Sequence, residues 1–199
     1  MSGLTWEDVS GGVGLRVTVP VTMGPDEGAR ELAPRLSALA GERAPASPHG
    51  EGARAKRAVP VVTIDGYSGS GKSTLAAALA RLVNGWQVLH LDDWYPGWDG
   101  LEAGADIARR IAADLRAGRA SSYEAWDWEN DTTGATTRVP LAPTIIEGCG
   151  AIEAEADLSV WIADPGEDER RSRALARDGQ TYAPHWRRWA DQDLGRPVK

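Results

Sequence analysis

The stretch that decides the fold runs from residue 61 to residue 83 and reads VVTIDGYSGSGKSTLAAALARLV. A run of β-branched and apolar residues comes first and ends at Asp65, as expected of a strand that is buried on both faces. A glycine-rich loop follows, and the alanine- and leucine-rich stretch after it favours a helix. A strand, a tight loop and a helix in this order indicate the opening unit of an α/β domain.

The loop matches the pattern G-x-x-x-x-G-K-S/T of the P-loop. Backbone N–H groups of such a loop turn inward and bind phosphate oxygens, and the helix that follows presents its positive N-terminus to the same anion. The lysine reaches the terminal phosphates, and the serine hydroxyl is a ligand for Mg²⁺. The sequence therefore predicts a nucleoside triphosphate, with ATP as the expected one, bound by Gly66, Ser68, Gly69, Ser70, Gly71, Lys72, Ser73 and Thr74.

Strands and helices alternate from residue 59 onward. Apolar runs predict strands at 59–65, 86–92, 143–148 and 157–164, and helical spacing predicts helices at 71–83, 103–118, 166–179 and 185–193. The alternation predicts a doubly wound α/β fold of the P-loop type, with about four parallel strands flanked by helices. No apolar strand follows the last helix, so a fifth parallel strand is not expected. Ligands of such sheets bind at the carboxyl ends of the strands.

The first 58 residues have a different character. Residues 14–24 alternate like a short strand, and residues 29–40 have the leucine spacing of a helix. Residues 41–57 are rich in proline, glycine and charge, which is typical of a linker. The sequence thus predicts an N-terminal extension over residues 1–58, with a short helix and a linker, and a P-loop domain over residues 59–199.

Composition limits the function classes. The 199 residues carry a formal net charge of −7, which argues against a nucleic-acid binder, and the single cysteine excludes an internal disulfide. There is no apolar run of about 18 residues and no signal peptide, so a cytoplasmic protein without a membrane partner is expected. The expected partner is a small molecule that accepts a phosphoryl group from the bound nucleotide. Self-association into a homo-oligomer stays open.

Acidic residues follow two of the predicted strands. Asp92 and Asp93 stand where an acceptor hydroxyl would meet the terminal phosphate, and an aspartate there can accept the hydroxyl proton and contact Mg²⁺ through water. A turn or a helix cap is the alternative role. Glu147 ends the third strand and would hold a Mg²⁺-bound water in the same crevice.

The segment from 119 to 142 is long and poor in helix signals. In one interpretation, Trp126 and Trp128 wall a pocket for a flat base or sugar face, and Asp127 forms a hydrogen bond to it. The other is a β-hairpin with one tryptophan in the core and the aspartate in solvent.

Three arginines of the helix at 166–179 are spaced three and four residues apart, so they share one face. Arg170, Arg173 and Arg177 could close over the transferring phosphate as a lid. Alternatively, they form a solvated face that is paired with the acidic residues of the same helix.

Six motifs resemble, in their order, those of the uridine kinase and phosphoribulokinase-like branch of the P-loop kinases. The family's loop, its D-x-F-Y, F-D-H-P, Y-D-F and E-G motifs and its lid helix are similar to GYSGSGKST (66–74), LDDWY (91–95), GWDG (97–100), WDW (126–128), IIEG (145–148) and DERRSRALARD (168–178). The family follows Y-D-F with a histidine and an arginine that help to recognise the pyrimidine, whereas ENDTTGATTR (129–138) has no histidine.

The resemblance implies an ATP- and Mg²⁺-dependent kinase that phosphorylates a hydroxyl of a nucleoside or nucleoside-like acceptor. It implies Asp92 as the base, Lys72, Arg170 and Arg173 at the transferring phosphate, Arg177 at the nucleotide, Ser73, Glu147 and Asp92 at Mg²⁺, and Asp99, Trp126, Asp127 and Tyr95 at the acceptor. Two alternatives stay open. The acceptor could be a sugar, a vitamin precursor or an antibiotic, or the chain could bind nucleotide without turnover because the family's last strand is missing.

Overall fold

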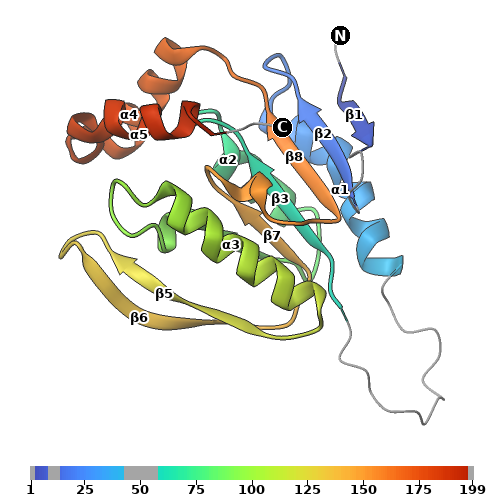
Figure 1. The fold of residues 1–199 in the computed structure, drawn as a ribbon. Helices are drawn as coiled ribbons and strands as arrows, with labels where there is room; N and C mark the ends of the chain where they lie inside the picture. Colours follow the sequence, from blue (N-terminus) through green and yellow to red (C-terminus); the bar gives the residue numbers. More distant parts are fainter. Residues whose placement is uncertain (1–2, 9–13, 43–57, 197–199) are drawn as a thin grey trace.

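The computed structural model describes residues 3–8, 14–42 and 58–196 (Figure 1). One mixed sheet forms its centre, and all its strands are parallel except the first, which is antiparallel to its neighbour. In spatial order the strands are β1 (Thr5–Asp8), β2 (Leu15–Val19), β8 (Leu158–Ile162), β3 (Val61–Asp65), β7 (Thr144–Glu147) and β4 (Gln87–His90). The predicted doubly wound α/β fold is thereby confirmed.

Helices cover both faces of this sheet (Figure 1). The α-helices are α1 (Pro25–Glu42), α2 (Lys72–Ala80), α3 (Leu101–Arg116), α4 (Glu167–Tyr182, broken at Gly179) and α5 (Trp186–Leu194). Three single turns of 3₁₀-helix are η1 (Leu91–Asp93), η2 (Ala151–Glu153) and η3 (Ala183–His185). One core cluster joins α1 and α2 to the sheet, and a second joins α3 and the C-terminal helices to the other face. Among the described residues, no helix combines the length and the apolar character needed to cross a bilayer.

The fifth parallel strand is β2, which forms within residues 14–24, where the sequence predicted a short strand but not its place in this sheet. It pairs in parallel with β8, with Val17 opposite Val160, and so extends the sheet beyond β8. The physical reason is that β8 would otherwise leave a row of unpaired N–H and C=O groups, while the alternation of β2 buries Val17 and Val19 against the core. The sheet therefore has five parallel strands where the sequence predicted about four, and the additional strand comes from the N-terminal extension.

The helix predicted ahead of the P-loop is α1, and it packs against α2. Leu32, Leu36 and Leu39 of α1 share a core cluster with Leu75 and Leu79 of α2. The expected boundary at residue 59 therefore falls between two elements that pack in one core. The predicted linker lies outside the described residues from residue 43 onward.

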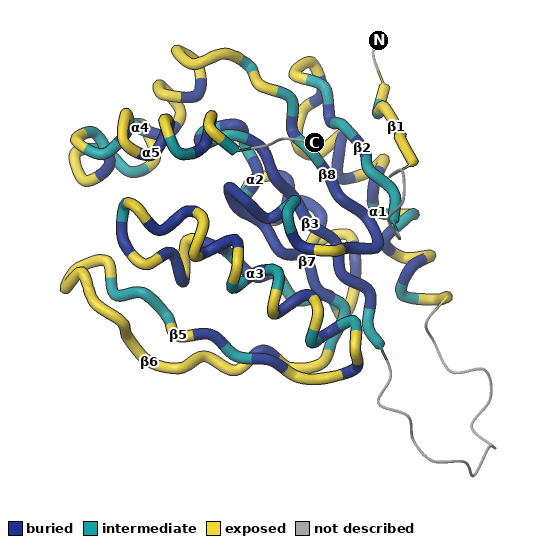
Figure 2. Tube along the Cα trace, in the orientation of Figure 1, coloured by how far each residue is buried: buried dark blue, intermediate teal, exposed yellow. Residues whose placement is uncertain are grey.

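The segment from 119 to 142 is a hairpin, as the second of the two interpretations had it. Strands β5 (Ser121–Asp127) and β6 (Thr132–Val139) pair antiparallel and form a separate two-stranded sheet beside α3. Figure 2 shows that β6 is exposed along nearly its whole length, whereas β5 has its more buried residues next to α3.

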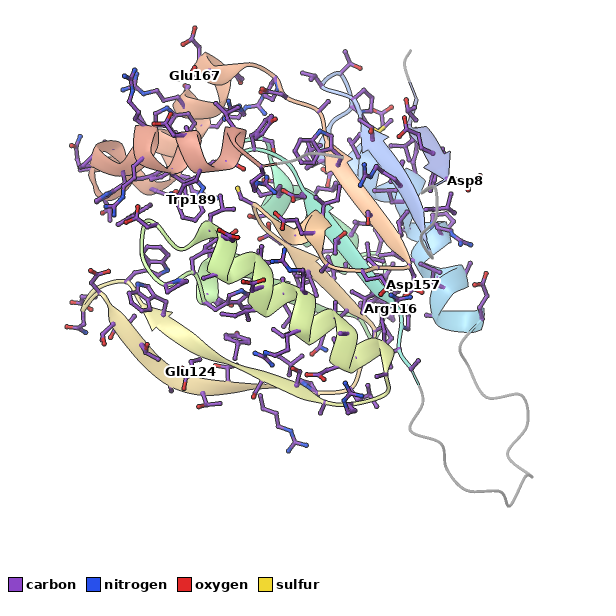
Figure 3. All side chains as sticks on the ribbon, in the orientation of Figure 1. Asp8, Arg116, Glu124, Asp157, Glu167 and Trp189 are labelled. Atoms are coloured by element: carbon purple, nitrogen blue, oxygen red, sulfur yellow. The ribbon has the colours of Figure 1, made fainter. Side chains whose placement is uncertain are left out.

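The carboxyl ends of β3, β7 and β4 meet at one edge of the sheet, and α4 and α5 lie at this edge (Figure 1). Figure 3 shows Trp189 of α5 there, whereas Arg116 and Asp157 mark the opposite end of the sheet. The loops that follow the three strands are therefore brought together under the C-terminal helices. This edge is where ligands of such a sheet bind.

Candidate active site

The P-loop leads from β3 directly into α2. Gly69 and Gly71 have φ values of 81° and 106°, a left-handed region that glycine adopts without strain. A side chain at Gly69 would also come 2.2 Å from the carbonyl oxygen of Arg170, so the loop and α4 touch through backbone. Gly71 is the residue before α2, which begins at Lys72. The loop thus adopts the turn that directs N–H groups and a helix N-terminus at one point, as phosphate binding requires.

Lys72 is the cation of this loop. Its side-chain Nζ donates to the backbone oxygen of Tyr67 at 3.2 Å and contacts Cys149 Sγ at 3.3 Å. Burial lowers the pKa of Lys72, but nearby negative charges, among them Asp193 and Glu147, outweigh that effect, so the net pKa is raised. Burial, together with Asp193, also raises the pKa of the Cys149 thiol to about 12, so the thiol is neutral at physiological pH. Lys72 is therefore a permanent positive charge at the loop.

A cleft of about 1100 Å³ opens beside the loop. It brings together the loop, the residues after β4 and β7, and the C-terminal helices. Its lining includes most of the predicted nucleotide residues, namely Ser68, Gly69, Gly71, Lys72, Ser73 and Thr74. Gly66 and Ser70 belong to the loop but do not line the cleft.

Two carboxylates line the cleft together with Lys72. Asp92 lies on η1 just after β4 and lines the cleft together with Glu147 at the end of β7. The residue keeps exposed surface, but surrounding protein groups shield its carboxyl from bulk water. Burial in the cleft and the charge of Glu147 raise the pKa of Asp92, whereas Lys72 and Arg177 oppose the rise. A carboxylate of raised pKa accepts a proton more readily at neutral pH, which is the property that a general base needs.

Glu147 is held by a neighbour on β4. Its Oε1 lies 2.5 Å from Nδ1 of His90, which stands beside it in the sheet register. This hydrogen bond raises the pKa of His90 above its usual 6.5. Only 3% of the Glu147 side chain is exposed, so its free oxygen has one accessible direction, toward the cleft.

The oxygen donors of the cleft suit Mg²⁺. Ser73, Asp92 and Glu147 line it together, and hydroxyl and carboxylate oxygens are ligands that this ion prefers. In the part of the chain that the structure describes, no cluster of three or more His, Cys, Asp or Glu side chains forms a ready cage for a metal ion. An ion bound through one or two carboxylates, waters and substrate phosphates fits this arrangement.

Aromatic side chains form the wall farther from the loop. Trp98 lies nearly parallel to the His185 ring at 4.3 Å and to the Tyr182 ring at 5.3 Å between centroids. Trp128 tilts against Trp98 at 4.9 Å, and its Nε1 donates to the backbone oxygen of Asp92 at 2.8 Å. We call Trp98, Trp128, Tyr182, His185 and Trp189 the aromatic wall, and all five line the cleft.

Only one of the four predicted acceptor residues lines the cleft. Tyr95 does so, and its hydroxyl donates to the backbone oxygen of Cys149 at 2.6 Å. Asp99 is paired with Arg188 of α5 and is not part of the lining. Trp126 does not reach the cleft either, and its Nε1 is buried without a hydrogen-bond partner among the described residues.

Asp127, the fourth of these residues, closes the turn of the hairpin. Its Oδ1 accepts the backbone N–H groups of Glu129 and Asn130, both at 3.0 Å, and its Oδ2 accepts the Asn130 side chain at 2.8 Å. The Asn130 hydrogen bonds lower the pKa of Asp127. An aspartate side chain that accepts hydrogen bonds from the backbone N–H groups just after it commonly stabilises a tight turn. The sequence could not separate this role from acceptor binding.

The three predicted lid arginines divide between two roles. Arg173 and Arg177 line the cleft, and they pair with Glu169 and Asp178 at 2.8 and 2.7 Å. Arg170 is only 2% exposed, does not line the cleft, and pairs with Asp164 at 2.8 Å. Its guanidinium lies 5.1 Å from the Tyr67 ring centroid, against the outside of the P-loop. The buried Arg170 therefore packs beside the loop and does not face the cleft. A direct role at the phosphate is open only to Arg173 and Arg177.

Sequence reasoning missed most of the aromatic wall. Trp128 was considered together with Trp126 as a possible wall of an acceptor pocket, and it lines the cleft, but Trp98, which precedes the predicted Asp99, was not considered. Tyr182, His185 and Trp189 come from the C-terminal helices, where the sequence suggested a role for arginines but none for these rings. The one available signal was composition, because the chain has nine tryptophans and no phenylalanine.

Comparison with known proteins gives structural likeness only. No protein-family model matches the chain, and no curated protein matches its sequence. A solved structure described as a possible uridine kinase, from Bacillus stearothermophilus, is 21% identical with a TM-score of 0.46, over 82% of this chain and 92% of that chain. A second, described as a fructose transport system kinase from Silicibacter sp. TM1040, is 22% identical with a TM-score of 0.48, over 80% and 86%. The function is therefore argued from the site itself.

Proposed function

We propose that the chain is an ATP- and Mg²⁺-dependent kinase that transfers the γ-phosphate to a hydroxyl of a nucleoside or nucleoside-like small molecule. The observation that carries the proposal is that the P-loop with Lys72, the carboxylate of Asp92 and the aromatic wall all border one cleft. Phosphoryl transfer needs positioning, charge neutralisation and a group that orients the attacking hydroxyl. The same cleft holds residues suited to each of these three tasks.

In the proposed reaction, the loop N–H groups and Lys72 bind the phosphates of ATP. Asp92 accepts the proton of the acceptor hydroxyl. The oxygen of that hydroxyl forms a bond to the γ-phosphorus, and the bond between the γ-phosphorus and ADP breaks. Arg173 and Arg177 face the same space and would neutralise charge on the transferring group. Ser73 and Glu147 would hold Mg²⁺, which supplies further charge neutralisation when bound.

The aromatic wall supports a flat acceptor. Rings of Trp98 and Trp128 border the cleft close to Asp92, since Trp128 is hydrogen-bonded to the Asp92 backbone. A base or a comparable ring can stack on such side chains. The wall therefore favours a ring-bearing acceptor over a small open-chain one.

A second candidate keeps the chemistry and changes the acceptor. It is favoured by the pairing of Asp99 with Arg188, because that carboxylate is then not free to bind the two hydroxyls of a ribose. The pair is exposed, and exposed pairs are worth only about 0–1 kcal/mol, so an acceptor could replace Arg188. A 2′-deoxynucleoside that reacts as well as the ribonucleoside would favour this second candidate.

Nucleotide binding without turnover is a further alternative, which was suggested by the absence of the family's last strand. Among the described residues no strand follows α5, but β2 adds a fifth parallel strand to the sheet beside β8. Asp92, Lys72 and Glu147 are all present in the cleft, so no residue of the proposed chemistry is missing.

The experiment is an acceptor screen. Purified protein, Mg²⁺ and ATP are incubated with ribo- and deoxynucleosides, sugars, vitamin precursors and antibiotics, and ADP release and the mass of each acceptor are measured. We expect ADP release that depends on one acceptor class, together with the mass increase of one phosphoryl group. ADP release that no acceptor stimulates would contradict the proposal.

A further inference from the structure

Helix α5, whose Trp189 lines the cleft, also contacts the P-loop through Asp193. The carboxylate Oδ2 of Asp193 accepts the backbone N–H of Ser68 at 2.7 Å. Asp193 is fully buried and does not line the cleft, so it does not occupy the position of a phosphate. A carboxylate in this place fixes the direction of one loop peptide without blocking the ligand.

A buried ion cluster connects this contact to the start of the loop. Arg196 pairs with Asp193 at 2.7 Å and with Asp65 at 2.9 Å, and both carboxylates are fully buried. Asp65 in turn accepts the N–H of Gly66 at 2.6 Å. Gly66 and Ser68, the first and third residues of the loop, are therefore both hydrogen-bonded to one cluster of three charged side chains.

The other polar groups of Ser68 are also held by the C-terminal helices. Its hydroxyl lies 2.9 Å from the Tyr182 hydroxyl, and its backbone oxygen accepts Arg170 Nη1 at 3.4 Å. Buried ion clusters are weak evidence for stability, because removing their charges from water is costly. A cluster that fixes the peptides of a ligand-binding loop has a second use, since binding groups held in place in advance give tighter binding.

Helix α5 is itself anchored at the acceptor side of the cleft. Gln192 Nε2 donates to the backbone oxygen of Trp98 at 2.8 Å, and the Trp189 ring meets the Tyr95 ring edge-on at 4.8 Å. Asp193 follows Gln192 on the same helix, so its position is fixed by contacts that do not involve the loop.

We propose that Asp193 is a positioning residue of the nucleotide site, which holds the P-loop in its nucleotide-accepting shape through Ser68 and Arg196. This inference rests on the proposed nucleotide binding. Without the carboxylate, the Ser68 N–H loses its acceptor and Arg196 keeps only Asp65. The loop must then be ordered by the nucleotide itself, and the affinity falls.

The experiment measures the dissociation constant of a fluorescent ATP analogue with Mg²⁺, which needs no acceptor. The variants are Asp193→Ala and Asp193→Asn, with Asp191→Asn as a matched control, because Asp191 is an exposed carboxylate on the same helix. Each titration is made well below the unfolding midpoint of the variant. A lost buried hydrogen bond costs about 1 kcal/mol or more, so we expect Asp193→Ala to weaken binding at least about fivefold.

The asparagine variant keeps an oxygen that can accept the Ser68 N–H but removes the charge. Charge-assisted hydrogen bonds are roughly twice as strong as neutral ones, so we expect about threefold weaker binding. It is also the decisive variant if Asp193→Ala fails to fold. Unchanged affinity in the Asp193 variants, with a lowered unfolding midpoint, would overturn the inference and leave Asp193 a purely structural residue. A wild-type protein that does not bind the analogue would instead contradict the proposed function.

Discussion

Replacing Asp92 by asparagine separates binding, chemistry and stability in one variant. The change keeps the shape of the side chain and removes the proposed base. Positioned bases contribute roughly 10²- to 10⁴-fold, so kcat should fall by at least about 10²-fold. Nucleotide affinity should change little, because Lys72 and the loop N–H groups are untouched.

The same variant should be more stable at neutral pH. Burial and the charge of Glu147 raise the pKa of Asp92 in the folded protein above its usual 3.8. The protonated form is therefore the one that the fold favours, and this contribution to stability is full below pH 3.8 and lost as the pH rises through the folded-state pKa. Above that pKa the ionised Asp92 destabilises the fold, and asparagine removes this cost.

The assay compares kcat, the dissociation constant for MgATP and the thermal midpoint of both proteins at pH 7 and near pH 4. We expect the variant to have a higher midpoint at pH 7 and a smaller advantage near pH 4. Asp93→Asn is the matched control, since Asp93 lines the same cleft and is the next residue. A large loss of kcat in Asp93→Asn with none in Asp92→Asn would refute the assignment of the base. An unchanged or lower midpoint at pH 7 would refute the electrostatic argument.

Four further changes test other parts of the site. Lys72→Ala should weaken MgATP binding and abolish transfer. Wild-type affinity of this variant for MgATP, measured by calorimetric titration, would contradict the role of the P-loop in nucleotide binding. Gly69→Ala should lower both the unfolding midpoint and the nucleotide affinity, because the new Cβ would come 2.2 Å from a carbonyl oxygen of α4 and the backbone φ is 81°. A variant with the wild-type midpoint and affinity would contradict that packing. Trp98→Ala should raise the acceptor KM by roughly 5- to 100-fold, the usual worth of a stacked base, and an unchanged KM would leave the aromatic wall without a role in acceptor binding. His90 has a raised pKa, so its stabilising contribution is full below pH 6.5 and declines as the pH rises through the folded-state value. His90→Gln should therefore flatten the fall in the free energy of unfolding above pH 6.5, and an unaltered slope in denaturant titrations would count against this hydrogen bond.

The sequence was sufficient wherever structure depends on neighbours along the chain. The strand, loop and helix around Lys72 form a local unit, and they occur where the pattern predicts them. The strands that end near Asp92 and Glu147 were also predicted, because apolar runs of this length bounded by polar residues have few alternatives. Their carboxyl ends then had to meet at one edge of a parallel sheet.

The sequence was insufficient where contacts join distant segments. Nothing in the alternation of residues 14–24 states that they pair with β8, more than a hundred residues later in the chain. The contact of Asp193 with Ser68 spans 125 residues, and an aspartate near the end of a polar helix gives no local signal of it. The hairpin was ambiguous for a related reason, since Asp127 is equally suited to a turn and to a ligand, and only the fold decides between them.

The central claim is that this cleft transfers a phosphoryl group from ATP to a small acceptor. The most direct measurement follows a radiolabelled γ-phosphate of ATP through a reaction with the acceptor panel and Mg²⁺, and separates the labelled products. We expect label in a phosphorylated acceptor, formed by the wild-type protein and absent with Lys72→Ala. Label that stays in ATP, or appears only as inorganic phosphate with every acceptor while the folded protein binds MgATP, would contradict it.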